Sequence, residues 1–467
     1  MITIQRAADV EAAFFDGRTF GDSIDMVQDV LADVRERGDA ALFDYGAKFD
    51  VSAPAALEIP PTELKAAAEK MQRAQPDLYR ALEYSRDLAL RFARRQRESF
   101  DNFELELEPG LFTGQKTIAV ERAGVYVPAG RFPLVSTVVM TLTPAIAAGV
   151  SEIVLCTPPR VHPDDRAAAD AAGTGTPGKP FTGGKPYADE GIMAAAYLCT
   201  CGASSDGGAE LSPLRVFACG GAQAVGAMAF GTQTIPRTDV IVGPGNKFVA
   251  EAKRLVYGTV GIDMIAGPTE VFIIADKSAN PAWVAADLLA QAEHDVVAQP
   301  VLATDSAELA HAVADEIETQ LAALPTRTVA EQSIATCGRI IITDTLEQAA
   351  DFANRKAPEH LELAMEEGAL RDRITALVHN YGSLFIGHGS AEVFGDYAAG
   401  LNHTLPTSGS ARFTGGLSVR MFLKTVTTLR TVAGSAGAVA SAKASGCIGD
   451  AEGLAGHARA ARIRLAQ

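Results

Sequence analysis

Short β-rich runs alternate with helical segments from about residue 117 onward, and this alternation constrains the fold more than any other feature. The runs are 117–120, 124–127, 152–156, 215–219, 240–242, 271–275, 301–304 and 339–343. Strands separated by helices are typical of parallel α/β units, because neighbouring parallel strands need a crossover connection. The sequence therefore predicts an α/β fold for this part of the chain.

The first hundred residues show a different pattern, which predicts helices. Ile24, Val27, Leu31 and Val34 recur at helical spacing, with charged residues between them. Residues 62–98 are rich in Ala, Glu, Arg and Leu, which favour helix. We therefore expect a helical region before the alternating part.

The length of the chain limits the number of its domains, and its net charge limits the kinds of partner that it can bind. A chain of 467 residues predicts two to four structural units, because single cores stop growing near ~250–300 residues. The net charge of −16 argues against nucleic acid and anionic membranes as partners. No apolar run reaches the ~18 residues of a spanning helix, and the N-terminus lacks a signal-peptide pattern. Six cysteines without a disulfide spacing pattern favour the reducing cytoplasm.

Two stretches rich in Gly, Pro and small polar residues are predicted as surface insertions. They are 170–187 and 202–213, and both lie between α/β elements. We expect them to interrupt one domain rather than to link two. After about residue 430 the composition turns to Ala, Gly and Ser, and a helix is expected near 453–462.

Two glycine motifs differ in what surrounds them. The motif at 173–178 matches the G-x-G-x-x-G spacing of a dinucleotide loop, but two prolines oppose the helix that such a loop must open. The motif GGAQAVG at 220–226 follows a predicted strand and opens an Ala-rich segment. Two interpretations fit this second motif: its glycines allow a ligand to approach the backbone closely, or they form a tight turn that binds no ligand.

Two short motifs place acids, amides and imidazoles at spacings that suit a metal or a proton transfer. Gln291 and His294 are three residues apart on a predicted helix, so we expect them to share one face. Glu359 and His360 set a carboxylate beside an imidazole directly after a proline, where a new element is expected to begin. Imidazole is the side chain best suited to proton transfer near neutral pH.

Two further motifs extend this set of donors. Asp396 and His403 lie in a predicted loop, and Glu452 and His457 lie five residues apart near the C-terminus. Oxygen and nitrogen donors of this kind suit zinc. Each motif taken alone is more typical of a solvated polar surface than of a metal or proton-transfer site, so the residues alone do not establish a site.

These motifs fall within eight ordered blocks. The blocks are GVYVPAGRFPLVSTVVMTLTPA at 124–145, GGAQAVGAMAFGT at 220–232, VGPGNKF at 242–248, GPTEVFIIAD at 267–276, DLLAQAEHD at 287–295, APEHLEL at 357–363, GDYAAGLNHTLPT at 395–407 and EGLAGHARA at 452–460. In this order they resemble the histidinol dehydrogenase family over nearly all of the chain, apart from the two insertions.

The resemblance implies two incomplete Rossmann-like α/β domains, an N-terminal helical region and a small C-terminal helical arm. The first domain is expected to comprise residues 1–125 and 268–416. The second, on the NAD side, is expected to comprise 126–267 with both insertions. Residues 417–467 are expected to form the arm and to pack on the partner of a homodimer.

The resemblance also implies one zinc ion per subunit, NAD as cofactor and a small amino alcohol as substrate. Glu359 and His360 match the catalytic acid–base pair. The positions that match zinc ligands are Gln291, His294, Asp396 and His457. The substrate is expected to contact these four residues and also Thr269, His360, His403 and Glu452. The positions that match NAD contacts are Tyr126, Gln223 and Asn246.

The implied activity is the NAD-linked oxidation of L-histidinol through L-histidinal to L-histidine, which completes histidine biosynthesis. His360 would take the hydroxyl proton, and Glu359 would activate water for the second oxidation. Two departures point to an alternative: Ala129 stands where the family usually has Gly, and Thr269 where it often has Ser. That alternative is a zinc- and NAD-dependent dehydrogenase of another small polar alcohol, such as sulfopropanediol. The intact set of motifs argues against a third reading, a catalytically silent paralogue.

Overall fold

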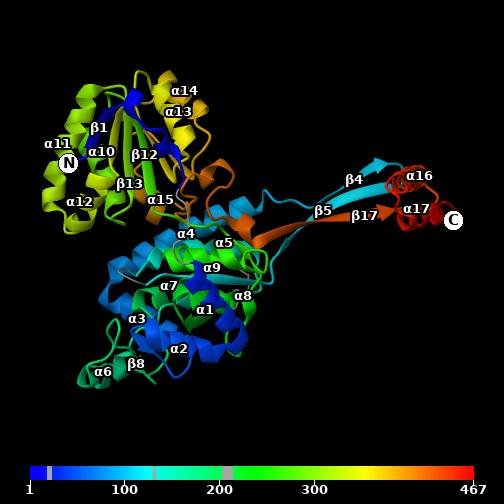
Figure 1. The fold of residues 1–467 in the computed structure, drawn as a ribbon, viewed down its shortest axis with the longest axis horizontal. Helices are drawn as coiled ribbons and strands as arrows, with labels where there is room; N and C mark the ends of the chain where they lie inside the picture. Colours follow the sequence, from blue (N-terminus) through cyan, green and yellow to red (C-terminus); the bar gives the residue numbers. More distant parts are fainter. Residues whose placement is uncertain (18–23, 130–132, 202–213, 467) are drawn as a thin grey trace.

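The computed structural model describes residues 1–17, 24–129, 133–201 and 214–466. Within these ranges the strands form two six-stranded sheets, a three-stranded ribbon and a two-stranded pair. The two large sheets and their helices form two separate α/β bodies, and the ribbon projects away from them to one side (Figure 1). The chain thus has the predicted α/β fold.

The first sheet is parallel throughout, in the order β1-β14-β13-β12-β15-β16. Its strands are β1 (Thr3–Arg6), β14 (Arg339–Ile342), β13 (Gln299–Thr304), β12 (Glu270–Ala275), β15 (His360–Ala364) and β16 (Ser383–Ile386). The helices that cover it are α10 (Pro281–Ala292), α11 (Ala307–Ala323), α12 (Arg327–Thr336), α13 (Leu346–Lys356) and α14 (Ala369–Leu377). Val271 and Ile273 of β12 pack in one core, and Phe272 and Ile274 pack in the other. A strand buried on both faces needs a continuous apolar run, which is why the sequence predicts β12 clearly.

The second sheet has the order β11-β10-β6-β7-β9-β3 and is parallel except for β3. Its strands are β11 (Gly261–Ile262), β10 (Val240–Val242), β6 (Arg122–Tyr126), β7 (Glu152–Thr157), β9 (Leu214–Ala218) and β3 (Glu58–Ile59). One face is covered by α3 (Pro61–Ala74), α4 (Pro76–Arg97), α5 (Val135–Ala148) and α7 (Glu190–Cys201). The other face is covered by α1 (Ile24–Arg37), α2 (Asp39–Phe49), α8 (Gly221–Phe230) and α9 (Lys247–Val256).

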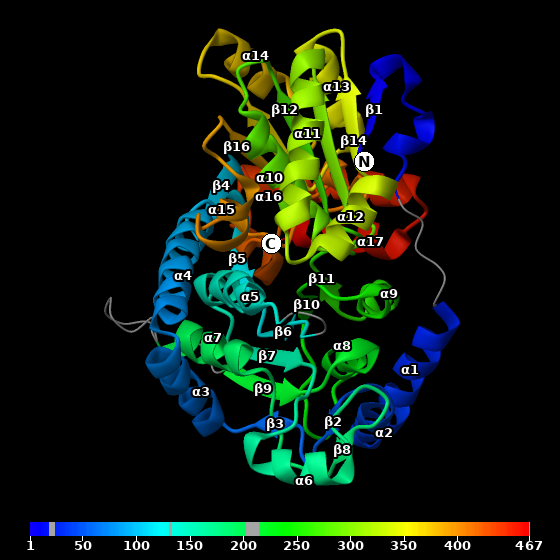
Figure 2. The ribbon, with the colours of Figure 1, turned by 90° about the vertical axis from the view of Figure 1, so that its left-hand side faces the viewer.

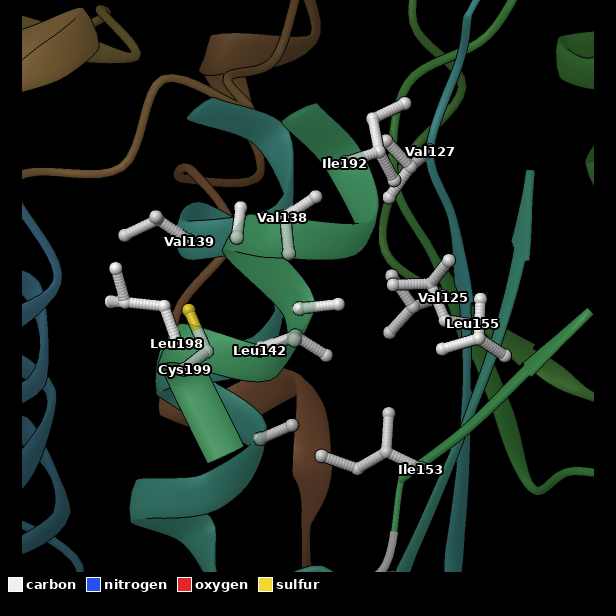
Figure 3. Packing of buried hydrophobic residues seen from close by; sticks show 14 of the residues in the cluster. Val125, Val127, Val138, Val139, Leu142, Ile153, Leu155, Ile192, Leu198 and Cys199 are labelled. Carbon is white, nitrogen blue, oxygen red and sulfur yellow. The ribbon is translucent and has the colours of Figure 1, made fainter. Parts of the chain in front are cut away.

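Figure 3 shows how tightly the first of these faces is packed. Val125 and Leu155 of the sheet face Val138 and Leu142 of α5, with Ile192 of α7 beside them. All five side chains are completely buried. Burying one Val or Leu side chain contributes about 1.5–3 kcal/mol to folding, so this layer rigidly fixes the strands that carry the cavity described below.

The N-terminal region makes contacts with both large sheets. The sequence assigns residues 1–125 to the first domain. The structure places β1 and residues 7–15 with the first sheet, but α1–α3 pack on the second sheet and β3 pairs with β9. These strand pairings join residues far apart in the chain, and local periodicity carries no information about them. The domain boundaries themselves stay a prediction.

The first predicted insertion is largely irregular. It starts in the last turn of α6 (Arg166–Ala172) and contains β8 (Phe181–Thr182), which pairs with β2 (Ser52–Ala53). No helix opens directly after the glycine motif at 173–178, as its prolines predict. The second predicted insertion, 202–213, lies outside the described residues.

The arm is a ribbon that carries two helices. Strands β17 (Leu423–Thr431), β5 (Leu111–Ala119) and β4 (Phe103–Glu108) pair antiparallel. Helices α16 (Ala436–Ala451) and α17 (Ala455–Arg462) lie at its far end (Figure 1). The C-terminal helical arm is thus confirmed, and β4 and β5 also belong to it. The strand predicted at 117–120 is present as the end of β5, but it pairs antiparallel instead of in a parallel α/β unit. Within the described ranges, no helix is long and apolar enough to cross a membrane.

Candidate active site

Thr269, Glu270, Glu359 and His360 come together because β12 and β15 are neighbours that begin at the same level of the sheet. Val271 of β12 is in register with His360 of β15. Since both strands begin here, the four residues lie at the amino edge of the first sheet. The prediction that a new element begins at Glu359–His360 is confirmed by the start of β15.

The Glu359 carboxylate is buried and held by two donors. Its Oε2 accepts a hydrogen bond from Thr269 Oγ1 at 2.5 Å and from the backbone N–H of Glu270 at 3.0 Å. Burial raises the pKa of Glu359 to about 7, against the lowering effect of His360 and of the two hydrogen bonds. A carboxyl group with a pKa near neutrality can both accept and donate a proton at physiological pH.

The His360 ring contacts acceptors on both of its nitrogens. Its Nε2 lies 3.3 Å from Asp396 Oδ1, and its Nδ1 lies 3.3 Å from the carbonyl oxygen of Glu270 and 3.8 Å from Glu359 Oε2. Burial lowers the pKa of His360, but Glu359 and Asp396 outweigh it and raise the pKa to about 10. These partners therefore favour the imidazolium form.

Asp396 lies in the last turn of α15 (Glu392–Tyr397), so the predicted loop is wrong at this position. The helix has only six residues, too few for a periodic sequence pattern. Burial raises the pKa of Asp396, but the hydrogen bond and charge of His360 outweigh it, and the pKa is lowered overall. Asp396 is thus a carboxylate at neutral pH.

Gln291 joins this cluster through Thr269. Its Nε2 donates to Thr269 Oγ1 at 2.6 Å, and its side chain is buried at the end of α10. Because the amide nitrogen is used in this way, the amide oxygen remains as the donor atom that a cation would meet. One threonine hydroxyl therefore connects Gln291 with Glu359.

His294 and His403 both lie near Asp396. The charges of both imidazoles contribute to lowering the pKa of Asp396. His294 lies in the turn directly after α10, outside the helix predicted to carry it, and its N–H donates to the Gln291 carbonyl at 3.4 Å. His403 is partly buried, and its Nε2 lies 3.2 Å from Ser136 Oγ.

The donor set near Asp396 fits zinc in chemistry but is incomplete within one chain. Gln291, His294 and Asp396 offer an amide oxygen, an imidazole and a carboxylate, which zinc accepts. In the part of the chain that the structure describes, no three His, Cys, Asp or Glu residues converge as a metal site. Of the four predicted zinc ligands, His294 and Asp396 are of these types and lie in this region, together with Gln291.

Glu452 and His457 are not brought to this cluster. Glu452 follows α16 and His457 lies in α17, and both are exposed. The ribbon holds these helices away from both α/β bodies (Figure 1). Within one chain, the structure therefore separates them from Glu359 and His360.

A separate cavity of about 500 Å³ lies beside the second sheet. All three residues predicted to contact NAD line it: Tyr126, Gln223 and Asn246. Tyr126 ends β6, Gln223 lies in the first turn of α8, and Asn246 caps α9. The cavity thus lies at the carboxyl ends of parallel strands, where ligands bind in open α/β sheets.

The glycine turn before α8 forms one wall of this cavity. Gly221 has φ of 67°, and a Cβ there would lie 2.7 Å from Gln223 Oε1. Its N–H donates to the Tyr126 hydroxyl at 3.1 Å. The positive φ favours glycine here, and a side chain would also displace the Gln223 amide. The motif at 220–226 is thus a tight turn that also lines a cavity.

Glu270 and Lys356 were not predicted as site residues, but they form a buried ion pair next to Glu359 and His360. Glu270 Oε2 lies 3.4 Å from Lys356 Nζ, and its Oε1 accepts from the N–H of Ser408. Lys356 Nζ also donates to Gln299 Oε1 at 2.8 Å. Both charged side chains are buried. The sequence offers one indication of Glu270 as a site residue: its carboxylate begins β12, directly before the apolar residues of that strand.

Comparison with known proteins decides the family. A family model described as histidinol dehydrogenase matches residues 17–176 and 208–465. The chain belongs to the histidinol dehydrogenase family. A histidinol dehydrogenase of Thermus thermophilus is 42% identical, with 99% of this chain and 100% of that protein covered. One from Synechococcus sp. is 42% identical, with 94% of this chain and 91% of that protein covered.

Two further relatives extend the comparison. A protein of Ruegeria pomeroyi named histidinol dehydrogenase homolog is 41% identical, with 95% of this chain and 93% of that protein covered. The crystal structure of histidinol dehydrogenase from Elizabethkingia anophelis matches with a TM-score of 0.84 at 32% identity, covering 99% of this chain and 98% of that chain. The similarity therefore extends over the whole fold, including the arm.

Proposed function

We propose that this chain is a histidinol dehydrogenase that oxidises L-histidinol through L-histidinal to L-histidine with two molecules of NAD⁺. The observation that carries this proposal is the cluster of Glu359, His360 and Asp396 at the amino edge of the first sheet, in a chain of this family. One group with a pKa near 7 lies beside an imidazole, which suits two successive proton transfers.

Glu359 and His360 have different tasks in the two oxidations. In the first, His360 accepts the hydroxyl proton of L-histidinol while a hydride leaves the carbinol carbon, and L-histidinal forms. In the second, Glu359 accepts a proton from water as the water adds to the aldehyde, and a hydride leaves the hydrate to give the carboxylate. Each hydride reduces one NAD⁺ to NADH. Thr269, His403 and Glu452 are the further side chains that we assign to substrate contacts.

Gln291, His294, Asp396 and His457 are the residues that would hold zinc, one ion per subunit. When bound, Zn²⁺ would fix and polarise the amino alcohol and, by competing for the Asp396 carboxylate, favour the neutral imidazole that His360 needs as a base. The NAD cavity is assigned to Tyr126, Gln223 and Asn246, which line it together.

We also infer a homodimer in which the arm of one copy completes the site of the other. Glu452 and His457 are exposed at the tip of the arm, far from the cluster that they would complete. The arm also exposes apolar side chains, among them Leu429 at 72%, Ile448 at 59% and Ile463 at 61%. Apolar surface of this kind on a projecting element favours burial against a second copy.

The remaining assignments concern location and partners. We place the enzyme in the cytoplasm, where buried free thiols such as Cys156 and Cys199 stay reduced. Its partners are a small amino alcohol, NAD and a second copy of the chain. We assign neither nucleic acid nor a membrane, given the net charge of −16.

Substrate and metal can be tested together with the purified protein. We expect two NADH per L-histidinol consumed and no NADH from (R)-2,3-dihydroxypropane-1-sulfonate. Removal of metal with a chelator should abolish turnover, and added Zn²⁺ should restore it. NADH formation from the sulfonate but not from L-histidinol would replace the proposed substrate. Unchanged turnover after chelation, with no metal left by mass spectrometry, would refute the zinc role.

A further inference from the structure

Asp50 places a carboxylate in the cavity that we assign to NAD. It follows α2, and its backbone N–H caps that helix on the carbonyl of Gly46 at 3.1 Å. Its side chain lines the cavity together with Tyr126 and Gln223. Within the described ranges, no hydrogen bond reaches the Asp50 carboxylate. The Asp50 carboxylate is therefore a hydrogen-bond acceptor in the cavity wall that a ligand can use.

Partial burial disfavours the charged form of this carboxylate. Burial raises the pKa of Asp50 to about 7, against the lowering effect of the Arg160 charge. Two neutral groups also face it, the Tyr126 phenol and the Cys219 thiol, and burial raises the pKa of both. The Asp50 side chain is half-buried, and titratable groups with a perturbed pKa in a cavity concentrate where ligands bind.

The other lining residues show what kind of ligand fits. Asp50 and Arg160 are the charged side chains among the described residues that line the cavity, and most of the rest are apolar, including Met26, Val30 and Phe248. Apolar walls suit a planar base, a guanidinium suits a phosphate, and a carboxylate suits donor hydroxyls. A ribonucleotide offers all three.

The cavity fits one half of the dinucleotide. None of its lining residues belongs to the Glu359–His360 cluster. The nicotinamide has to reach that cluster to accept a hydride, so it has to leave the cavity. The portion that stays inside is therefore the adenosine half, and the hydroxyls near Asp50 are those of the adenosine ribose.

The first insertion, 170–187, shapes this part of the cavity. Phe181 N–H donates to Val51 O at 3.1 Å, and Gly183 N–H donates to Ala53 O at 2.9 Å. These bonds pair β8 with β2 directly after Asp50, and Figure 2 shows β8 and α6 beside β2 and α2. Pro177 of the same insertion lines the cavity. The insertion thus fixes the backbone that follows Asp50.

We propose that Asp50 accepts hydrogen bonds from the adenosine ribose hydroxyls and makes the chain select NAD⁺ over its 2′-phosphorylated form. A 2′-phosphate would remove one donor hydroxyl and place negative charge against the carboxylate. This inference rests on the proposed function for its choice of ligand. Asp50 is a specificity residue and takes no part in the proton transfers.

The test compares wild type with Asp50→Asn in steady-state assays with NAD⁺ and NADP⁺, and in calorimetric binding of AMP and adenosine 2′,5′-bisphosphate. We expect the preference for NAD⁺ in kcat/KM to fall by about tenfold or more, mostly through KM. AMP should bind more weakly to the variant, and the bisphosphate should bind more tightly. The Tm of the ligand-free variant at pH 8 should be equal to or above that of wild type, since a partly buried charge is removed.

Asp44→Asn is the matched control, because Asp44 lies on the same helix but is exposed and pairs with Arg37. It should leave cofactor preference unchanged. Equal loss with both cofactors in Asp50→Asn, together with a lower Tm, would show a structural role and overturn the inference. Failure of wild type to oxidise L-histidinol would refute the proposed function alone if the nucleotide preference still follows Asp50. Absence of binding of either nucleotide to wild type would overturn both.

Discussion

Oε2 of Glu359 lies 3.8 Å from Nδ1 of His360, although the two side chains bond to different partners. Successive side chains within a strand point to opposite faces, which would separate neighbours. Glu359 directly precedes β15 and thus escapes this alternation, while His360 is the first residue of the strand. The pair can therefore act on one substrate from adjacent positions.

Glu359→Gln is expected to separate the two oxidations. Gln retains the shape and the acceptor oxygen for Thr269 but cannot take a proton from water. NADH formation from L-histidinal should fall by about 10²–10⁴-fold, and formation from L-histidinol should fall less. Stopped-flow measurement of NADH with each substrate checks this. An equal fall with both substrates would contradict the assignment of Glu359 to the second step.

His360→Ala is expected to reduce the oxidation of L-histidinol by about 10²–10⁴-fold, because the alcohol then has no base. The matched control is His311→Ala, since His311 is exposed on α11 and lies in neither the cluster nor the cavity. Its kcat should equal that of wild type. Full activity of His360→Ala would refute the base assignment.

The sequence predicted the parallel strands well and the edge elements poorly. Runs such as 271–275 are buried on both faces, so their apolar character is continuous. By contrast, β1 lies in a region predicted as helical and is fixed by its pairing with β14, more than three hundred residues away. β4 alternates Phe103, Leu105 and Leu107 with glutamates, a strand pattern that was not used in the prediction, and all of its side chains are exposed.

The candidate site likewise contains some residues that the sequence reveals and others that only the three-dimensional structure brings together. Glu359 and His360 are adjacent in sequence, so a short motif reveals them. The bond of Thr269 to Gln291 requires β12 and α10 to be placed in space, and the Glu270–Lys356 pair requires α13 as well. Spacing within one segment carries no information on such contacts, and the family resemblance names ligands without giving these supporting residues.

Thr269→Val is expected to disturb Glu359 and Gln291 together. The hydroxyl donates to Glu359 and accepts from Gln291, so its loss removes one of the two donors to Glu359 and leaves the buried Gln291 amide without this acceptor. We expect kcat/KM to fall by about 10–100-fold and zinc content to fall with it. Thr269→Ser keeps the hydroxyl and should stay close to wild type. Equal loss in both variants would show that the methyl group, rather than the hydroxyl, matters.

Lys356→Met is expected to lower the free energy of unfolding by about 3–5 kcal/mol, because it leaves Glu270 buried without its cation. Burial raises the pKa of Glu270, and Lys356 opposes this. In the variant the folded state must keep Glu270 protonated, so its stability should fall further as pH rises above the unfolded value of about 4.3. Urea unfolding between pH 5 and 8 measures both effects. Lys65→Met, which removes an exposed pair with Glu69 on α3, should change the stability by less than about 0.5 kcal/mol.

Mixing two inactive variants tests whether the arm serves a second copy. His457→Ala removes a donor at the tip of the arm, and His360→Ala removes the base in the body of the chain. If the arm reaches the other subunit, a heterodimer of the two variants has one intact site and one doubly defective site. Co-expression with two affinity tags should then give about half of the wild-type activity per dimer. The control is a heterodimer of His360→Ala with Asp396→Asn. Both residues lie in the body of the chain, so each site has one defect and this heterodimer should stay inactive. If the first heterodimer is as inactive as this second one, His457 acts within its own chain and the exchange of arms is refuted.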